Sequence, residues 1–345
     1  MNPMTRSRAD ADGKVSELTA TYYGERASAG LLVTEGIAPS PNGKGYARIP
    51  GLWSAEQVAA WLPVTKAVHD AKGHIFAQLM HTGRVSHTAN MTAGAKVVAP
   101  SALALAGEIW TDAHGQQPHS APEAFDAAGI QQAKDELVNA ARNAIAAGFD
   151  GVELHGANGY LIEQFLSPVT NQRSDRYGGS VENRLRFLLE LATETAAAIG
   201  ADRVALRISP YGKNGGMSEY PELDETYLGL AKALAPLGLA YLHVADHFGV
   251  SFGGPGSHPK LEALKANLRE AWGPRAFLVG GSFDKASATR ALSEGKVDLV
   301  GFGRAFLANP DLVRRFRDDL SLNAPDPSTF FTPGAKGYTD YPHAP

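Results

Sequence analysis

Residues 151–168 read GVELHGANGYLIEQFLSP, and the fold of the whole chain can be argued from them. Residues 152–154 form a short, mostly apolar run after an amphipathic helical pattern, which predicts a buried strand. In a barrel of alternating strands and helices, catalytic groups stand where a strand ends. Three polar side chains follow this predicted strand directly: His155, Asn158 and Tyr160. The stretch therefore predicts an α/β barrel with its chemistry at this strand end.

These three side chains suit the polarisation of a carbonyl group. His155 and Asn158 can both donate hydrogen bonds to one oxygen, and Tyr160 can deliver a proton nearby. An isolated His-x-x-Asn pair more often belongs to a packed core. Residues 171–184, NQRSDRYGGSVENR, favour the functional interpretation, because they are too polar and glycine-rich for a core yet lead directly into a strong helix.

Taken together, residues 155–184 closely resemble the signature of the Old Yellow Enzyme family, the FMN-dependent ene-reductases. The resemblance covers nearly all of residues 1–345, and it is also specific over 302–310 and 337–342. It implies an α/β fold of the (β/α)8 TIM-barrel type, with 1–345 as a single FMN-binding domain. It also implies transfer of hydride from NADPH or NADH, through the flavin, to an activated C=C bond.

The composition excludes several classes of protein. The 345-residue chain is 44% hydrophobic with a formal net charge of −4, so it offers no electrostatic footprint for nucleic acid or an anionic membrane. It contains no cysteine, which excludes disulfides, Cys-ligated zinc, iron–sulfur clusters and thiol catalysis. No apolar run approaches the roughly 20 residues that span a bilayer, and no signal peptide opens the chain. We expect a soluble cytoplasmic protein, monomeric or homodimeric, that acts on a small-molecule activated alkene.

Outside the opening stretch, the chain alternates strand and helix patterns. Short apolar strands without polar alternation indicate a parallel sheet that is buried on both faces. No Gly-x-Gly-x-x-Gly follows the first predicted strand, which favours a barrel over a doubly wound sheet. The predicted strands are 31–35, 75–79, 151–155, 204–208, 240–245, 277–280 and 298–301. The predicted helices are one ending at Gly30, then 55–72, 130–147, 181–199, 224–235, 260–272 and 284–294, with a last helix from near Pro310 and a loop over 82–128.

The seven predicted strands are one short of a closed eight-stranded barrel. In the family that the chain resembles, residues like Met1–Arg8 form the end of the first strand and its loop, normally after roughly two dozen further residues. We therefore expect either that the numbering starts late relative to the functional protein or that the first strand is incomplete. An incomplete first strand would leave two unpaired sheet edges and an open barrel bottom.

Polar or glycine residues that could bind a ligand occur at the ends of most predicted strands. Packing alone does not predict this distribution. Arg207 is the most informative, because a buried arginine inside an apolar strand needs an acceptor or an anionic partner. Glycines and an arginine before a helix suit an anion, because backbone N–H groups at a helix N-terminus bind phosphate. The strand-end positions are Thr5, Gly36, Gln78, His155, Arg207, Gly280–Gly281 and Gly303–Arg304.

The resemblance implies that these residues hold FMN. Arg207 would face the N1/O2 edge of the isoalloxazine ring and stabilise the anionic reduced flavin. Gln78 would pair with the pyrimidine edge, and Thr5 would donate a hydrogen bond near O4. The backbone at Pro3, Met4 and Gly36 would line the ring, and the phosphate would bind at Gly281, Gly303 and Arg304.

The resemblance also assigns the second half of the reaction. The carbonyl or nitro oxygen of the substrate would lie between His155 and Asn158, and Tyr160 would protonate the α-carbon. A nicotinamide would reduce the flavin and leave before the substrate binds, which explains the missing dinucleotide motif. The substrate pocket would further include Tyr46, Met80 and Phe331.

Other functions remain as alternatives. A metal site at His243 and His247 is disfavoured, because the pair straddles a strand end with Asp246 as its one nearby carboxylate. A sugar-phosphate aldolase or isomerase would need a buried strand-end lysine or a carboxylate–histidine set, and neither is found. A flavin-binding but catalytically impaired barrel, or a non-enzymatic binding protein, stays open because of the incomplete first strand. The larger dienoyl-CoA reductases are excluded by the absence of cysteine, since they carry an iron–sulfur domain.

Overall fold

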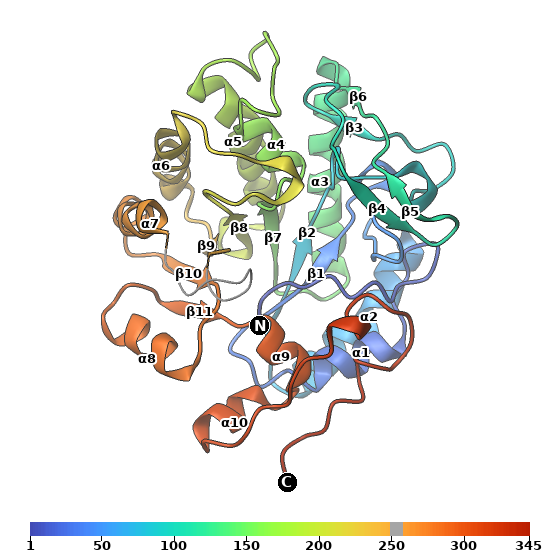
Figure 1. The fold of residues 1–345 in the computed structure, drawn as a ribbon, viewed down its shortest axis with the longest axis vertical. Helices are drawn as coiled ribbons and strands as arrows, with labels where there is room; N and C mark the ends of the chain where they lie inside the picture. Colours follow the sequence, from blue (N-terminus) through green and yellow to red (C-terminus); the bar gives the residue numbers. More distant parts are fainter. Residues whose placement is uncertain (249–257) are drawn as a thin grey trace.

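Seven parallel strands surrounded by helices make up the computed structural model, which describes residues 1–248 and 258–345 (Figure 1). The strand order is β1–β2–β7–β8–β9–β10–β11, with every neighbouring pair parallel, so the connecting helices cross outside the sheet as in a TIM barrel. The strands are β1 (Leu32–Ile37), β2 (Ile75–Leu79), β7 (Gly151–Gly156), β8 (Val204–Ile208), β9 (Tyr241–Ala245), β10 (Ala276–Gly280) and β11 (Leu299–Gly301). The helices are α1 (Glu17–Gly24), α2 (Ala55–Asp70), α3 (Ala127–Ala146), α4 (Leu161–Leu166), α5 (Val181–Ile199), α6 (Leu223–Leu234), α7 (Pro259–Trp272), α8 (Lys285–Ser293), α9 (Arg304–Ala308) and α10 (Leu312–Arg317).

Local sequence signals account for many of these boundaries. Helix α2 begins at a capping box, in which Ser54 Oγ accepts from the Gln57 N–H and the Gln57 side chain accepts from the Ser54 N–H. The predicted bounds of β2, β8 and α5 are confirmed residue for residue, and α10 confirms the helix predicted from near Pro310. Helix α9 was not predicted. It is separate from α10 because Asn309 precedes a proline and takes an extended backbone conformation, with φ −132° and ψ 91°.

Two predicted connections differ from the structure. The helix expected to end at Gly30 ends at Gly24, after which the chain continues through turns to β1. The loop expected over 82–128 contains a hairpin, β4 (Glu108–Thr111) with β5 (Gly115–Pro118), and a parallel pair, β3 (Val98–Ala99) with β6 (Glu123–Ala124). Side chains of β4 alternate between exposed and buried, a pattern too short to recognise in a four-residue strand.

The edges of the seven-stranded sheet are bridged by the first two residues of the chain. The Asn2 N–H donates to Phe302 O (2.9 Å) just after β11, and the Val33 N–H of β1 donates to Met1 O (3.1 Å). The Met1 amino group donates to Leu31 O (2.6 Å). Met1 and Asn2 thus occupy the position of a first barrel strand. The expectation of two wholly unpaired edges was wrong at these residues, although the described part of the chain contains no full eighth strand.

Burial of this N-terminal segment has two consequences. The Met1 amino group is cut off from water, and burial lowers its pKa to about 5. The Asn2 side chain fills the space above two strand-end glycines, Gly280 of β10 and Gly301 of β11. Side chains at those two positions would collide with Asn2, so the glycines allow the segment to lie against the sheet.

The loop after Met1 and Asn2 is held by the C-terminal segment. Arg6 Nη2 donates to Gly337 O (2.8 Å), a residue 331 positions away in the chain. The Arg8 guanidinium lies over the Tyr338 ring, 4.6 Å from its centroid. These contacts fix the backbone directly after Pro3–Thr5, the segment predicted to line the flavin.

None of the helices in the described ranges combines the length and the apolar character that a membrane span requires.

Replacing Gly301 by alanine tests the placement of Asn2. The new Cβ would lie 1.8 Å from Asn2 Oδ1 and must displace that side chain. We expect Gly301→Ala to lower the free energy of unfolding by about 1–3 kcal/mol, measured by denaturant titration. Gly30→Ala is the matched control, because nothing lies within 4 Å of its new Cβ. The double variant Asn2→Ala/Gly301→Ala should regain the lost stability, and failure to regain it would contradict this placement.

Candidate active site

The parallel register brings the predicted site residues to one level of the barrel. Gln78 on β2 is paired with Glu153 on β7, and His155 on β7 is paired with Arg207 on β8. Arg207 is paired in turn with His243 on β9. Because the carboxyl ends of parallel strands meet at one edge, residues predicted from separate stretches become neighbours in space.

His155 is a neutral imidazole that presents an Nε2–H. Its Nδ1 accepts a hydrogen bond from the Ala157 N–H (3.3 Å), so the single proton of the neutral ring lies on Nε2. Burial, and then the nearby Arg207 guanidinium, hold the pKa of His155 well below its ordinary value. Asn158 Nδ2 lies 3.5 Å from His155 Nε2. Two donors therefore converge, which is the arrangement that polarises one oxygen.

Tyr160 adds a protonated phenol beside these donors. Its ring packs edge-on against His155 with 4.9 Å between centroids, and its hydroxyl lies 3.1 Å from the Tyr46 hydroxyl. Burial raises the pKa of Tyr160, so the phenol keeps its proton at neutral pH. Tyr46 and Tyr160 both pack against a small buried cluster that contains Met80. The structure thus brings together four residues predicted for catalysis and substrate binding.

Phe331, the third residue predicted for the substrate pocket, lies apart from this group. Its side chain is 59% exposed, and it is not among the side chains that pack against the Met80 cluster. Its carbonyl accepts a hydrogen bond from Arg48 Nη2 (2.9 Å). The structure therefore gives Phe331 a backbone contact and does not place its ring with Tyr46 and Met80.

Glu163 is a buried carboxyl that the sequence analysis did not identify. It accepts hydrogen bonds from the Gly159 N–H (2.6 Å), the Tyr227 hydroxyl (2.7 Å) and the Ser209 hydroxyl (2.9 Å). Ser209 Oγ also accepts from the Asn158 N–H (2.8 Å). Asn158 has a left-handed backbone with φ 60°, which asparagine tolerates better than most residues. Glu163 thus holds the turn that carries Asn158. The signal that could have revealed it is an acidic residue inside the apolar run 160–166.

A second buried carboxylate, Glu153, organises the barrel interior. It accepts hydrogen bonds from Gln78 Nε2 (2.8 Å), His243 Nδ1 (2.8 Å) and the Tyr241 hydroxyl (3.0 Å). Burial alone would raise the pKa of Glu153, but His243, Arg207 and Gln78 together hold it below its ordinary value. With Nε2 used in this way, the Gln78 carbonyl is left to accept hydrogen bonds from a ligand.

Arg207 has the character expected of a residue that binds an anion. It is buried, and its Nε has no hydrogen-bond partner among residues 1–248 and 258–345. A buried donor without a partner costs about 1–3 kcal/mol, and a bound acceptor removes that cost. Gly36 on β1 lies so close to Met80 that a Cβ would stand 2.4 Å from the Met80 sulfur. Gly36 therefore presents its backbone, and not a side chain, at this position.

The residues predicted for the phosphate follow β10 and β11. Gly281 comes directly after β10, Gly303 caps α9, and Arg304 is the first residue of that helix. The Met4 sulfur lies 3.4 Å from the position of a Cβ on Gly303, so the Pro3–Thr5 segment passes beside this strand end. The unpartnered Arg207 donor and this glycine-lined strand end fit the anionic edge and the phosphate of FMN.

The two histidines weighed as a metal pair have separate partners. His243 binds Glu153, and His247 Nε2 lies 2.7 Å from Asn158 Oδ1. Within the part of the chain that the structure describes, no three His, Cys, Asp or Glu side chains are grouped as metal ligands.

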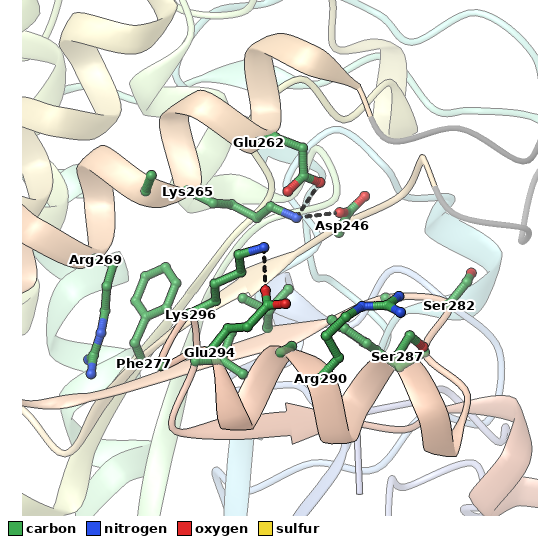
Figure 2. Close-up of a pocket in the computed structure, with 17 residues that line it drawn as sticks. Asp246, Glu262, Lys265, Arg269, Phe277, Ser282, Ser287, Arg290, Glu294 and Lys296 are labelled. Atoms are coloured by element: carbon green, nitrogen blue, oxygen red, sulfur yellow. Dashed lines mark hydrogen bonds and ion pairs between the residues drawn. The ribbon is translucent and has the colours of Figure 1, made fainter.

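A cavity of about 770 Å³ opens on the outer side of the barrel, between α7 and α8 (Figure 2). Two lysines in its wall pair with carboxylates there: Lys265 with Asp246 (2.9 Å) and Glu262 (2.7 Å), and Lys296 with Glu294 (2.6 Å). Gly281 is the one predicted site residue in its wall, and His155, Asn158 and Tyr160 are not part of it. The cavity therefore touches the predicted phosphate site at Gly281 and does not include the oxygen-binding residues of the candidate active site.

The known proteins similar to this chain include flavin-dependent oxidoreductases. The model of the NADH:flavin oxidoreductase / NADH oxidase family matches residues 1–323. A probable flavin mononucleotide-dependent alkene reductase of Leishmania infantum is 41% identical, over 99% of this chain and 92% of that protein. The structure of an old yellow enzyme homologue from Zymomonas mobilis has a TM-score of 0.93 at 40% identity, covering 99% of this chain and 94% of that one. Morphinone reductase in complex with tetrahydroNAD has a TM-score of 0.92 at 40% identity, covering 100% and 93%.

The pH dependence of stability tests the burial of Glu163. Burial raises the pKa of Glu163 from 4.5 to about 7, so between these values the folded protein binds more protons than the unfolded chain. The contribution of Glu163 to stability is therefore complete below its unfolded pKa and is lost as the pH rises through 7. We expect wild type to lose stability relative to Glu163→Gln between about pH 5 and about pH 8, measured by denaturant titration. The exposed Glu225→Gln is the control for loss of a carboxyl, and a difference that is the same at both pH values would contradict the assignment.

Proposed function

We propose that this chain, which belongs to the NADH:flavin oxidoreductase / NADH oxidase family, is an ene-reductase. As a member of that family it is an NAD(P)H-dependent flavin oxidoreductase with FMN as its cofactor. The proposed substrates are α,β-unsaturated carbonyl or nitro compounds, with NADPH as the preferred reductant. The observation that carries the proposal is the convergence of His155 Nε2 and Asn158 Nδ2, 3.5 Å apart, beside the Tyr160 phenol.

In this proposal the two donors bind the carbonyl or nitro oxygen of the substrate. Withdrawal of electron density toward that oxygen makes the β-carbon electrophilic. Because His155 is buried and neutral, it donates a hydrogen bond without giving up a proton. FMN, when bound, carries the hydride from the nicotinamide to that β-carbon.

Tyr160 then supplies the proton. Its phenol is protonated at neutral pH, and protonation of the α-carbon completes the reduction of the C=C bond. The Tyr46 hydroxyl, 3.1 Å away, can donate a hydrogen bond to the phenolate oxygen that remains. Met80, in the cluster beneath both tyrosines, closes the pocket floor with an unbranched and adaptable side chain.

The cofactor residues keep the roles that the sequence analysis gave them. Arg207 would stabilise negative charge at the N1/O2 edge, and the free carbonyl of Gln78 would accept from the pyrimidine edge. Thr5 would hydrogen-bond near O4, beside backbone from Pro3, Met4 and Gly36. Gly281, Gly303 and Arg304 would bind the phosphate.

The alternatives are less well supported. An aldolase of the Schiff-base type needs a lysine at a strand end, and the described strands contain none at their carboxyl ends. A catalytically impaired barrel is disfavoured by the intact arrangement of His155, Asn158 and Tyr160. We also propose a cytoplasmic location, where NADPH and NADH are available as reductants.

The visible spectrum of the purified protein tests the proposal directly. We expect a flavin absorption band that bleaches when NADPH is added without oxygen and returns when 2-cyclohexenone follows. Bleaching without return would contradict alkene reduction while leaving reductant oxidation intact. A protein that stays colourless with added FMN would contradict the whole assignment.

Substitution of Tyr160 by phenylalanine tests the proton donor. We expect enone reduction to slow by roughly 10²–10⁴-fold, the range for loss of a general acid. Reduction of the bound flavin by NADPH should remain, because that half-reaction needs no proton from the phenol. Tyr341→Phe is the control, since this hydroxyl accepts only a surface contact from the Asp326 N–H (2.9 Å). Full enone turnover by Tyr160→Phe in stopped-flow kinetics would rule out its acid role.

A further inference from the structure

We propose that His247 is a positioning residue that orients the Asn158 amide, so that Nδ2 and not Oδ1 faces the substrate oxygen. This inference rests on the proposed function, because it deepens the role of the same oxygen-binding pair. The contact behind it is the 2.7 Å approach of His247 Nε2 to Asn158 Oδ1. The two residues come from different strand ends, Asn158 after β7 and His247 after β9, so the contact spans the end of β8.

An asparagine side chain in this place can take two orientations. With Nδ2 toward His155, two N–H donors converge on the substrate position. With Oδ1 toward His155, the amide would accept the His155 Nε2–H and remove that donor from the site. The substrate would then face no convergent pair. The orientation of one amide therefore decides whether the site can polarise an oxygen.

His247 selects between these orientations through its own proton. An imidazole that carries hydrogen on Nε2 donates to Oδ1 and turns Nδ2 toward His155. An imidazole with hydrogen on Nδ1 would instead accept at Nε2 and favour the reverse orientation.

The surroundings of His247 keep it available as a donor. Burial first, and then Arg207, lower the pKa of His247 to about 4, with Asp246 acting in the opposite direction. Protonation at still lower pH leaves hydrogen on Nε2, so the hydrogen bond to Oδ1 survives in both charge states. The backbone of Asn158 is fixed independently, because its N–H donates to Ser209 Oγ (2.8 Å). The amide rotation is the remaining freedom, and His247 restrains it.

Three substitutions separate donation from simple packing. His247→Gln places an amide N–H near the position of Nε2 and should preserve the orientation. His247→Leu removes the donor, and His247→Glu supplies only an acceptor, which should turn Nδ2 away from the site. His114→Gln, on the exposed turn between β4 and β5, is the matched control.

The probe is p-nitrophenol bound to the FMN-loaded enzyme, because its phenolate oxygen needs both donors and its ionisation is visible by absorbance. We expect wild type, His247→Gln and His114→Gln to bind the phenolate equally. His247→Leu should bind it roughly tenfold more weakly, as expected for one hydrogen bond to a charged group. His247→Glu should bind it more weakly still and raise the apparent pKa of the bound phenol.

Two outcomes would overturn the inference. One is phenolate affinity in His247→Leu equal to wild type, and the other is an equal loss in the Gln and Leu variants, which would indicate packing alone. Nitrogen-15 NMR of the histidines gives an independent reading, since the inference requires the Nε2–H form of His247 and an Nδ1–H form contradicts it. Enone reduction by the wild-type enzyme tests the proposed function separately. Failure of the His247 inference can therefore be distinguished from failure of the proposed function.

Discussion

The hydrogen bonds accepted by Glu163 are the interaction on which the site most depends. One carboxyl joins three parts of the barrel: the turn after β7 through Gly159, the end of β8 through Ser209, and α6 through Tyr227. Each donor, if left buried without its acceptor, would cost about 1–3 kcal/mol. The strained backbone of Asn158 is therefore held by a network outside the site, and the catalytic side chains need supply none of that restraint themselves.

Inside the barrel, another buried carboxyl group likewise restrains residues of the site. Glu153 occupies three donors, among them Gln78 and His243, and so determines which atoms of the interior remain free. What remains for a ligand is the Arg207 Nε, which has no partner among residues 1–248 and 258–345. Residues that never touch a ligand thus decide the hydrogen-bonding character of those that do, and a buried carboxylate is well suited to this because it only accepts.

The sequence was sufficient to predict those elements and site residues whose signal lies within a few neighbouring residues. The strand 75–79, the apolar strand 204–208 and the helix 181–199 each depend on neighbours within a few residues, and the predicted bounds of all three are confirmed. His155, Asn158 and Tyr160 were found because they follow one strand in close order. Glu163 was missed, and His247 was considered only as a metal ligand, because Ser209 and Asn158, the partners that give them their roles, lie 46 and 89 residues away. The position of the Phe331 ring likewise depends on tertiary packing that the sequence does not display.

The contact between Arg6 and Gly337 has a consequence for how the protein reaches its native state. These residues are 331 positions apart, so the pairing is among the least local contacts in the chain. Loop-closure entropy grows by about 0.6 kcal/mol for each doubling of loop length, and non-local pairings form slowly. We therefore expect the strands and helices between them to assemble before the two segments meet. The Pro3–Thr5 loop is therefore ordered late in folding, and during synthesis on the ribosome it must wait for residues near 337 to emerge.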